Sequence, residues 1–527
     1  MSRALGVAIG PIGEIRGIDA SDGHRSLWLA TAEGQEFPAL QGDVEVDIAV
    51  VGGGITGVTV AHLLKREGKS VALLEMGRIG QGTTGNTTAK VTVGQALVFA
   101  DLTARHGPED ARLFADSNRD AIRQMATLVV ELGIDCDWEQ ASNYVYTESS
   151  GRLGELERER EAMRSAGILA EMTRETGLPF PVAGAIRVDD QAQLHPLKYL
   201  AGLVARIPGD GSHVLEQTCA KAVEGGEKPV VETSSGRVRA AHVVVATQLP
   251  FLDRGLFFAK AHPQKSFAVS AEVEEARAPE GMYINIDEPT RSIRSAPSRG
   301  ARRHLIVGGE SRRPGDEEND QQAYPALAEF MRAEFDVEPG LRWSAHDYIP
   351  VDGLPYIGPL RRRDERIHVA TGFAKWGMTK ATIAARIITD AIVGRPNPWA
   401  ALYDTRRLTP RASAVSLVAE NARVARRFVG DRLGASSPAA RLGPDEGAVV
   451  RVGRRHHAVY CDEFGHKHVL SARCPHLGCL VAWSEADKTW ECPCHGSRFT
   501  GEGQLLQGPA ITGLEVQELA EPGPASG

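Results

Sequence analysis

The stretch VDIAVVGGGITG, residues 46–57, decides the fold of the N-terminal part of the chain. Its first six residues form a short apolar run rich in β-branched side chains, which predicts a buried parallel strand. Glycines stand at 52–54 and at 57, and residues 58–67 then repeat apolar side chains at helical spacing. A second apolar run, SVALL at 70–74, leads directly to Glu75. This order of strand, glycine-rich turn, helix, strand and acid predicts a dinucleotide-binding βαβ unit.

Each glycine of this unit has a physical reason. Gly52 permits the tight turn, Gly54 lets backbone N–H groups approach a pyrophosphate, and Gly57 lets the helix pack close to the strand. The helix N-terminus then faces the phosphates with its positive dipole end. Glu75 is expected to accept a hydrogen bond from a ribose 2′-hydroxyl. A glycine triplet in an ordinary turn is the alternative, and the complete βαβ context argues against it. The expected contacts are Gly52, Gly54, Ile55, Thr56, Gly57, Glu75 and Met76.

The rest of the chain divides around this unit. Its 527 residues suit about three domains. Further buried strands are expected at 243–247 and 368–372, with strands and charged loops between them, so a substrate domain is inserted into the nucleotide-binding domain. A helix over 412–433 precedes a Ser/Pro-rich boundary and a small β domain. The expected division is an N-terminal arm at 1–43, an oxidoreductase unit at 44–404 (nucleotide-binding segments about 44–100, 196–260 and 350–404; substrate domain mainly 101–195 and 261–349), a helical linker at 405–433 and a last domain at 434–527.

Composition restricts the partners. The chain is 42% hydrophobic and 24% charged with a net charge of −8, which is ordinary globular usage without a basic excess. We therefore expect no nucleic-acid partner. No apolar run reaches the roughly 18 residues of a membrane span. The apolar stretch near the N-terminus is interrupted by Pro11 and Gly13 before it could form a signal core. These features predict a cytoplasmic protein.

Five of the seven cysteines fall between Cys461 and Cys494, which indicates one local metal or redox site. Two segments carry them, CPHLGC at 474–479 and CPCHGS at 492–497, and each offers a thiolate and an imidazole on a short loop. Two such loops can hold a binuclear iron centre, with two thiolates on one iron and two imidazoles on the other. In that reading the ligands are Cys474, Cys492, His476 and His495.

A zinc site is the alternative, since two cysteines and two histidines satisfy a tetrahedral ion. Zinc fingers, however, usually place both cysteines in one half and both histidines in the other. Here each half is mixed, and Cys479 and Cys494 remain as a second matched pair, which favours iron. Cys461 is left without a role.

These loops resemble the Rieske [2Fe-2S] pattern over about the last 90 residues. The resemblance implies that Cys479 and Cys494 form a disulfide, that residues 508–510 form the proline loop over the cluster, and that Ser497 hydrogen-bonds a cluster sulfide. High-potential members carry a Tyr two residues after that Ser, whereas this chain has Phe499. Loss of that hydroxyl should lower the reduction potential and weakens an analogy with quinol oxidation.

Residues from about 44 to 400 resemble the D-amino-acid oxidase/glycine oxidase superfamily of FAD proteins. The resemblance rests on the segments 83–90, 218–223, 352–358 and 371–379. It implies that the N-terminus of a helix points at the flavin C2 carbonyl and stabilises negative charge on the reduced ring. The further FAD contacts that it implies are Thr83, Thr84, Thr88, Ala89, Lys90, Ala220, Lys375, Trp376, Gly377, Met378 and Thr379.

One departure bears on the substrate. Amino-acid-oxidising relatives place an Arg just before the DGxPYIG stretch to bind the substrate carboxylate, and here residues 346–350 read HDYIP. An amine or an uncharged donor is therefore as consistent with the sequence as an amino acid. Asp347, Tyr348 and Trp376 are the candidate pocket residues; the first two are alternatively structural groups, and Trp376 is alternatively a core side chain.

The expected fold is an α/β FAD-binding Rossmann-type domain with an inserted α+β substrate domain, followed by an all-β Rieske domain. The expected function is an FAD-dependent oxidoreductase with a [2Fe-2S] cluster. A small donor gives two electrons to FAD, and the cluster passes them singly to an external carrier; flow in the reverse direction is also open. The alternatives are an oxidase reoxidised by O₂ with an auxiliary Rieske domain, and a redox sensor or electron carrier without turnover.

Overall fold

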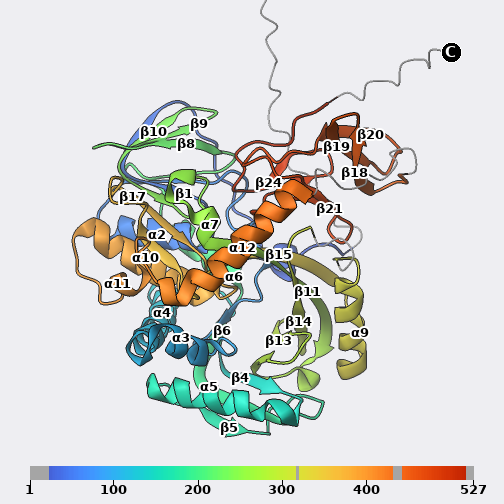
Figure 1. The fold of residues 1–527 in the computed structure, drawn as a ribbon. Helices are drawn as coiled ribbons and strands as arrows, with labels where there is room; N and C mark the ends of the chain where they lie inside the picture. The colour runs from blue at the N-terminus through green and yellow to red at the C-terminus, as the bar shows by residue number, and fades with distance from the viewer. Residues whose placement is uncertain (1–22, 316–319, 431–441, 518–527) are drawn as a thin grey trace, which may run out of the picture.

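The computed structural model describes residues 23–315, 320–430 and 442–517, and in this part the chain forms four β-sheets (Figure 1). Two of the sheets are large and two are small. The first 22 residues of the expected N-terminal arm lie outside the described residues. The expected boundary at 434 also lies outside them, so that boundary stays a prediction.

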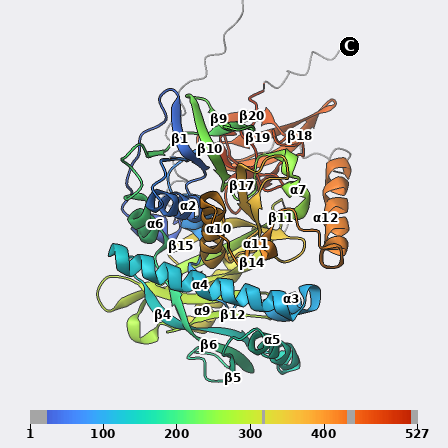
Figure 2. The same ribbon diagram turned by 90° about the vertical axis from the view of Figure 1, so that its left-hand side faces the viewer.

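The first large sheet, sheet A, has eight strands with the order β16-β17-β10-β1-β2-β7, and β9 and β8 extend it from β10. β1 runs parallel to both β2 and β10, and β10 runs parallel to β17. Helices α2 (Ile55–Arg66) and α10 (Gly377–Val393) pack on this sheet and on each other (Figure 2). This is the predicted Rossmann-type arrangement. The strands are β1 Val44–Val51, β2 Val71–Leu74, β7 His213–Leu215, β8 Ala220–Glu224, β9 Val230–Thr233, β10 Arg237–Val245, β16 Tyr356–Pro359 and β17 Ile367–Thr371.

The second large sheet, sheet B, has nine strands, with the order β15-β11-β14-β13-β12-β4-β6-β3 and with β5 on β6. Alternate residues of its central strands point to the same face, and the apolar side chains of one face pack against helix α9 (Ala323–Phe335). The confirmed fold class therefore includes the inserted α+β part. The strands are β3 Lys90–Val91, β4 Glu139–Thr147, β5 Glu171–Thr173, β6 Gly184–Gln193, β11 Ala261–Glu274, β12 Met282–Asn285, β13 Arg291–Pro297, β14 Arg302–Arg312 and β15 Leu341–Pro350.

Helices fill the space between and around the two sheets. Helix α4 (Pro108–Leu132) runs between the helices of sheet A and the strands of sheet B (Figure 2). None of the helices in the described part of the chain combines the length and the apolar character that crossing a membrane requires. The remaining helices are α1 Leu27–Thr31, α3 Val98–His106, α5 Leu153–Ser165, α6 Pro196–Val204, α7 Phe257–Lys260, α11 Ala400–Tyr403 and α12 Pro410–Gly430.

Residues 442–517 contain two small antiparallel sheets, as predicted for the all-β domain. A cluster of buried side chains that includes Trp490, Phe499 and Leu470 joins them. This domain lies beside sheet A and sheet B, at the upper right of Figure 1. Its strands are β18 Glu446–Val452, β19 Arg455–Cys461 and β20 Lys467–Ser471 in one sheet, and β21 Ala482–Ser484, β22 Thr489–Glu491, β23 Arg498–Thr500 and β24 Leu505–Gln507 in the other.

Candidate cofactor sites

The glycine turn lies where β1 leads into α2. Gly52 has a φ of +109°, and a Cβ there would lie 2.6 Å from the carbonyl oxygen of Ala246. A Cβ on Gly57 would lie 1.9 Å from the carbonyl oxygen of Gly52, so the helix can approach the turn only because this residue lacks a side chain. Helix α2 begins after Gly54, which has no side chain to cap it, and Thr84 accepts only the N–H of Ile55, so the next N–H groups of the positive end can face an anion. The residues present fit a bound dinucleotide phosphate.

Glu75 holds this turn against the end of β2. Its carboxylate accepts hydrogen bonds from the backbone N–H groups of Gly53 at 2.7 Å and Gly77 at 2.8 Å. Burial raises the pKa of this carboxyl. Two carboxylate oxygens have about four lone-pair positions, so Glu75 can also accept from a ribose hydroxyl. The ribose contact stays a prediction, as do the contacts of the half-buried Met76 next to it and of Ala220, which begins β8 and is buried.

The segment from Thr83 to Lys90 connects the glycine turn with sheet B. Thr84 Oγ1 accepts from the Ile55 N–H at 3.0 Å, and Thr83 Oγ1 donates to the carbonyl of His346 at 2.9 Å. The Lys90 ammonium donates to Ser292 Oγ at 2.7 Å and to a carbonyl of β12, and burial lowers its pKa well below the usual value. The side chain of Lys90 therefore extends into sheet B, and its contact with FAD stays a prediction.

Thr88 and Ala89 are held by a buried cation. Arg294 donates to the carbonyl oxygens of Thr88 at 3.0 Å and of Ala89 at 2.9 Å, and Ala89 has a φ of +57°. A Cβ built on Gly308 would lie 3.5 Å from Thr88 Cγ2 and 3.8 Å from Ser292 Cβ. The face of sheet B that carries Ser292 and Gly308 therefore meets the segment predicted to contact the flavin.

The loop before α10 has an unusual backbone. Ala374 and Lys375 both have positive φ, at 51° and 69°, and α10 then begins after Trp376 without a side-chain cap. Asp347 fixes this loop, because its carboxylate accepts the backbone N–H of Lys375 at 2.5 Å and of Tyr348 at 2.7 Å. Gly377, Met378 and Thr379 form the first turn, and Thr379 Oγ1 donates to Asn118 Oδ1 at 2.7 Å.

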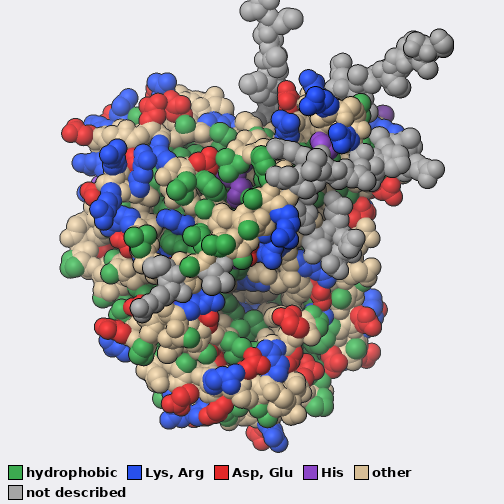
Figure 3. Space-filling model, in the orientation of Figure 1, with side chains coloured by type: hydrophobic (Ala, Val, Ile, Leu, Met, Phe, Trp, Pro, Cys, Tyr) green, Lys and Arg blue, Asp and Glu red, His purple; other side chains and the backbone are tan. Residues whose placement is uncertain are grey.

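Lys375 is exposed along its side chain, and its ammonium donates to Ser311 of β14. The surrounding protein nevertheless lowers the pKa of Lys375 to about 8, chiefly by desolvation. Figure 3 shows a hollow near the centre of one face of the molecule, between its upper and lower parts.

The two cysteine loops have matching turns. The N–H of Gly478 bonds to the carbonyl of Cys474, and the N–H of Gly496 bonds to the carbonyl of Cys492, each at 2.9 Å. The structure contains the expected disulfide between Cys479 and Cys494, which joins the loops. These two cysteines and Cys492 have sulfur atoms within 4.8 Å of one another. They do not form a three-thiolate site, since the disulfide uses two of the three sulfur atoms.

The four candidate ligands form two pairs, one of thiols and one of imidazoles. The buried thiols of Cys474 and Cys492 interact with each other, and this contact lowers the pKa of the first and raises that of the second. The rings of His476 and His495 are 4.9 Å apart, edge to face. Among the described residues neither ring has a partner for its buried Nδ1. Burial lowers the pKa of both imidazoles, that of His495 to about 3, and so favours the neutral form that binds metal. The donor set fits a binuclear iron centre.

Ser497 lies at the expected place for tuning such a centre. Its Oγ accepts the Ala510 N–H at 3.0 Å, which ties the turn at 508–510 to the second loop, and it interacts with the Cys474 thiol. Its predicted bond to a cluster sulfide stays a prediction.

The histidine end of the two loops faces the rest of the protein and is covered by it. His476 Nε2 lies 2.9 Å from Asp253 Oδ1, and the Phe258 ring of α7 lies 5.6 Å from the His495 ring and 6.4 Å from the His476 ring. Tyr348 donates its hydroxyl to the His495 carbonyl at 2.8 Å. Only 4% of the His476 side chain is exposed. Sequence reasoning missed Asp253 and Phe258, because they lie more than 200 residues before the motif and stand in no motif of their own.

A cluster of buried charges also crosses this contact. The ammonium of Lys265 on β11 lies 3.2 Å from Asp320, 2.8 Å from Asp487 and 2.9 Å from Glu491, and Arg498 lies 3.0 Å from Asp487. Burial alone would lower the pKa of Lys265, but the three carboxylates outweigh it and raise that pKa. Further polar partners of the cluster are Ser484, Tyr324, Ser344, His346 and His24. Sequence reasoning missed these residues too.

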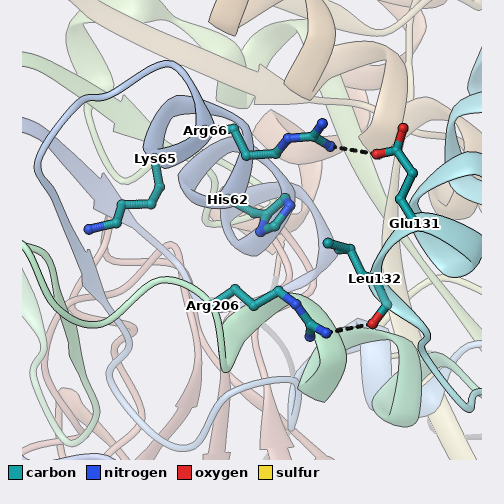
Figure 4. Close-up of a pocket in the computed structure, with 6 residues that line it drawn as sticks. All are labelled: His62, Lys65, Arg66, Glu131, Leu132 and Arg206. Atoms are coloured by element: carbon teal, nitrogen blue, oxygen red, sulfur yellow. Dashed lines mark hydrogen bonds and ion pairs between the residues drawn. The ribbon is translucent and has the colours of Figure 1, made fainter.

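The pocket in Figure 4 lies elsewhere. It has a volume of about 420 Å³ and is lined by residues at the C-terminal end of α2 and by the ends of α4 and α6. Arg66 pairs with Glu131 at 3.1 Å, and Arg206 bonds to the carbonyl of Leu132. Both arginines therefore bond to other parts of the protein. The glycine turn lies at the opposite end of α2. The pocket therefore does not belong to the cofactor sites.

Comparisons with known proteins cover both parts of the chain. The family model "FAD dependent oxidoreductase" matches residues 47–391, and the model "Rieske [2Fe-2S] domain" matches residues 435–518. The Bacillus subtilis protein YhfW, named as a Rieske 2Fe-2S iron-sulfur protein, is 32% identical over 95% of this chain and 99% of its own length. Gamma-glutamylputrescine oxidoreductase of Escherichia coli is 23% identical over 70% of this chain and 89% of its own. A crystal structure of glycine oxidase from Geobacillus kaustophilus superposes with a TM-score of 0.57, at 20% identity, over 69% of this chain and 100% of its own.

Proposed function

Because the chain belongs to the FAD-dependent oxidoreductase family and carries a C-terminal Rieske [2Fe-2S] domain, we propose that it works as a two-cofactor enzyme. A small amine, amino acid or related donor loses two electrons at FAD, and the cluster passes them one at a time to an external acceptor. For an amine, the C–N single bond becomes C=N with release of two electrons and two protons. FAD supplies the acceptance of two electrons together and their release singly.

The orientation of the Rieske domain carries this proposal. Its candidate histidine ligands lie against α7 and Asp253, and Tyr348 bonds to the backbone of His495. Tyr348 follows Asp347, which holds the loop before α10, the helix predicted to point at the flavin. Two consecutive residues of β15 therefore contact the predicted flavin loop and the predicted cluster ligand. This supports direct electron transfer within one chain.

On the flavin side, the contacts of several predicted residues support a part in binding or positioning. The uncapped start of α10 supplies positive dipole charge, and Asp347 holds the loop before it in its strained conformation. The Asp347 carboxylate accepts hydrogen bonds from two backbone N–H groups of the protein, those of Tyr348 and Lys375. We therefore assign Asp347 to positioning the loop and not to contact with the substrate. Lys375 and Ser311 are the polar groups that we propose for substrate contact, since the Lys375 ammonium reaches across to sheet B.

The proposed substrate class rests on the absence, before the DGxPYIG stretch, of the arginine that binds the carboxylate in amino-acid-oxidising relatives. Asp347 occupies the region where amino-acid-oxidising relatives carry a carboxylate-binding Arg, so a simple α-amino acid lacks its usual partner. The relative from Escherichia coli is named for gamma-glutamylputrescine, which is an amine. We therefore propose an amine, with or without a distant carboxylate, as the first substrate class to test.

Anaerobic stopped-flow spectroscopy of the full chain tests the proposal. A panel of amines and amino acids is mixed with the oxidised protein, and flavin absorbance and cluster circular dichroism are followed together. Flavin bleaching followed by cluster reduction is the expected result. Flavin bleaching without cluster reduction would overturn the coupling in favour of an O₂-linked oxidase. Absence of reduction by the whole panel, with cluster reduction by dithionite intact, would favour a sensor or electron carrier.

A further inference from the structure

We propose that Asp253 is a positioning residue for the cluster. Its carboxylate accepts the Nε2–H of His476, leaves Nδ1 of that ring for iron, and lowers the reduction potential of the cluster. The inference rests on the proposed function only in taking the cluster as the electron carrier. This carboxylate comes from outside the Rieske domain, because Asp253 belongs to the FAD-dependent part of the chain.

The geometry assigns different roles to the two ring nitrogens. Nε2 of His476 lies 2.9 Å from Asp253 Oδ1, whereas Nδ1 is buried and has no partner among the described residues. An imidazole that donates from Nε2 keeps the lone pair on Nδ1 for a metal. A carboxylate that accepts from a metal-bound histidine fixes the ring orientation and raises the basicity of the ligand. Asp253 and His476 have the arrangement that this effect needs.

The two histidine rings differ in this respect. His495 has the aromatic ring of Phe258 at 5.6 Å and contributes its backbone carbonyl to Tyr348, while the ring itself has no carboxylate partner in the described part of the chain. The added negative charge is therefore on one side of the cluster only. It favours the oxidised cluster, which carries one positive charge more than the reduced cluster. Asp253 acts in the same direction as the absence of a hydroxyl at Phe499.

Asp253 can be changed without disturbing a core. About half of its side chain, 49%, is exposed, and it lies at the start of a short turn, Asp253–Gly255, before α7. Asp253→Asn keeps a carbonyl oxygen that can accept from Nε2 and removes only the charge. Asp253→Ser removes the charge and shortens the side chain. It is measured in the same way if Asp253→Asn does not load its cluster.

The experiment is a reductive titration of the full-length holoprotein with dithionite and redox mediators, followed by cluster circular dichroism. No substrate is used, so failure of the proposed function would leave this measurement valid. We expect Asp253→Asn to raise the ratio of reduced to oxidised cluster at a given potential about tenfold, equivalent to about 59 mV for one electron. A change of less than about threefold, or a fall in the ratio, overturns the proposal.

Two control variants separate charge from docking. Glu45→Gln removes an exposed carboxylate near the start of β1 that pairs with Lys228 and not with a histidine, and it should leave the ratio unchanged. Gln507→Met removes a neutral hydrogen bond between the Rieske domain and Gln248, which is 2.6 Å long, without changing any charge. If either control shifts the ratio as much as Asp253→Asn does, the shift reports surface charge or loosened docking, and the assignment is wrong.

Discussion

Replacing Lys265 by Met should lower the urea concentration at which the Rieske domain separates from the rest of the protein, compared with the wild type. Lys265 is fully buried and is shared by Asp320, Asp487 and Glu491 at distances of 3.2, 2.8 and 2.9 Å. With Arg498, the cluster has two cations against three carboxylates, a net charge of −1 if the nearby histidines are neutral. The substitution makes this −2 and leaves carboxylates buried without their main partner. Breaking a buried ion pair from one side costs about 3–5 kcal/mol.

The loss is large enough to measure against a matched control. About 4 kcal/mol corresponds to roughly a thousandfold change in the equilibrium between docked and undocked states. Equilibrium urea titration, followed by cluster circular dichroism and by flavin fluorescence, should show an earlier transition of the cluster signal in K265M. Lys228→Met removes the same residue type from an exposed pair with Glu45 that is also 2.8 Å long, and should cost at most about 1 kcal/mol. Equal losses in the two variants would refute the role of burial.

Three further outcomes are expected. Lys265 and Arg498 hold the pKa of Asp487 well below its usual range despite its burial, so its contribution to stability is complete above the unfolded pKa of about 3.9 and is lost as the pH falls below it; acid unfolding of wild type and D487N checks this. Gly57→Ala places a Cβ 1.9 Å from the carbonyl oxygen of Gly52 and should reduce the flavin content of the purified protein more than tenfold, read from the ratio of flavin to protein absorbance. His495→Ala should abolish the visible circular dichroism of the cluster and leave the flavin spectrum in place.

Each of these outcomes has a control. D487N should have a flatter stability profile below about pH 4 than wild type, and identical profiles would contradict the linkage argument. Gly34→Ala meets no atom within 4 Å and should keep its flavin. Cys461→Ser changes a buried free thiol outside the two loops and should keep the cluster. Retention of the cluster in H495A would show that His495 is not a ligand.

The parts of the fold that depend on short local sequence patterns could be predicted from the sequence. The stretch at 46–57 and the acid at Glu75 define the βαβ unit, because each glycine answers a local steric requirement. The two cysteine loops were equally readable, since the disulfide partners and the four candidate ligands come from two short motifs. In both cases the residues stand in short local motifs whose spacing can be read along the chain.

The relation between the two cofactor sites was not predictable from the sequence. Asp253 meets His476, and Lys265 meets Glu491, across sequence separations of more than 200 residues. Neither residue stands in a motif, and a single buried lysine in a strand pattern indicates nothing about its partners. Asp347 illustrates a different difficulty: its position suggested a pocket residue, while its hydrogen bonds to the Tyr348 and Lys375 N–H groups indicate a positioning role.

The buried charges and the covered histidines together explain how this chain can hold its two cofactor sites in a fixed relative position. A buried ion cluster contributes little net stability compared with apolar packing, but few arrangements satisfy all of its charges. Such a cluster therefore suits an interface whose geometry matters more than its strength. Lys265, Glu491 and Arg498 form that interface directly behind the loop that begins at Cys492, while Tyr348 and Asp253 contact the histidine side. A domain that swung away to deliver each electron would have to break both sets of contacts. Under the proposed function, electrons therefore pass between the centres in the docked state, and a carrier would approach a different face of the Rieske domain from the one that α7 covers.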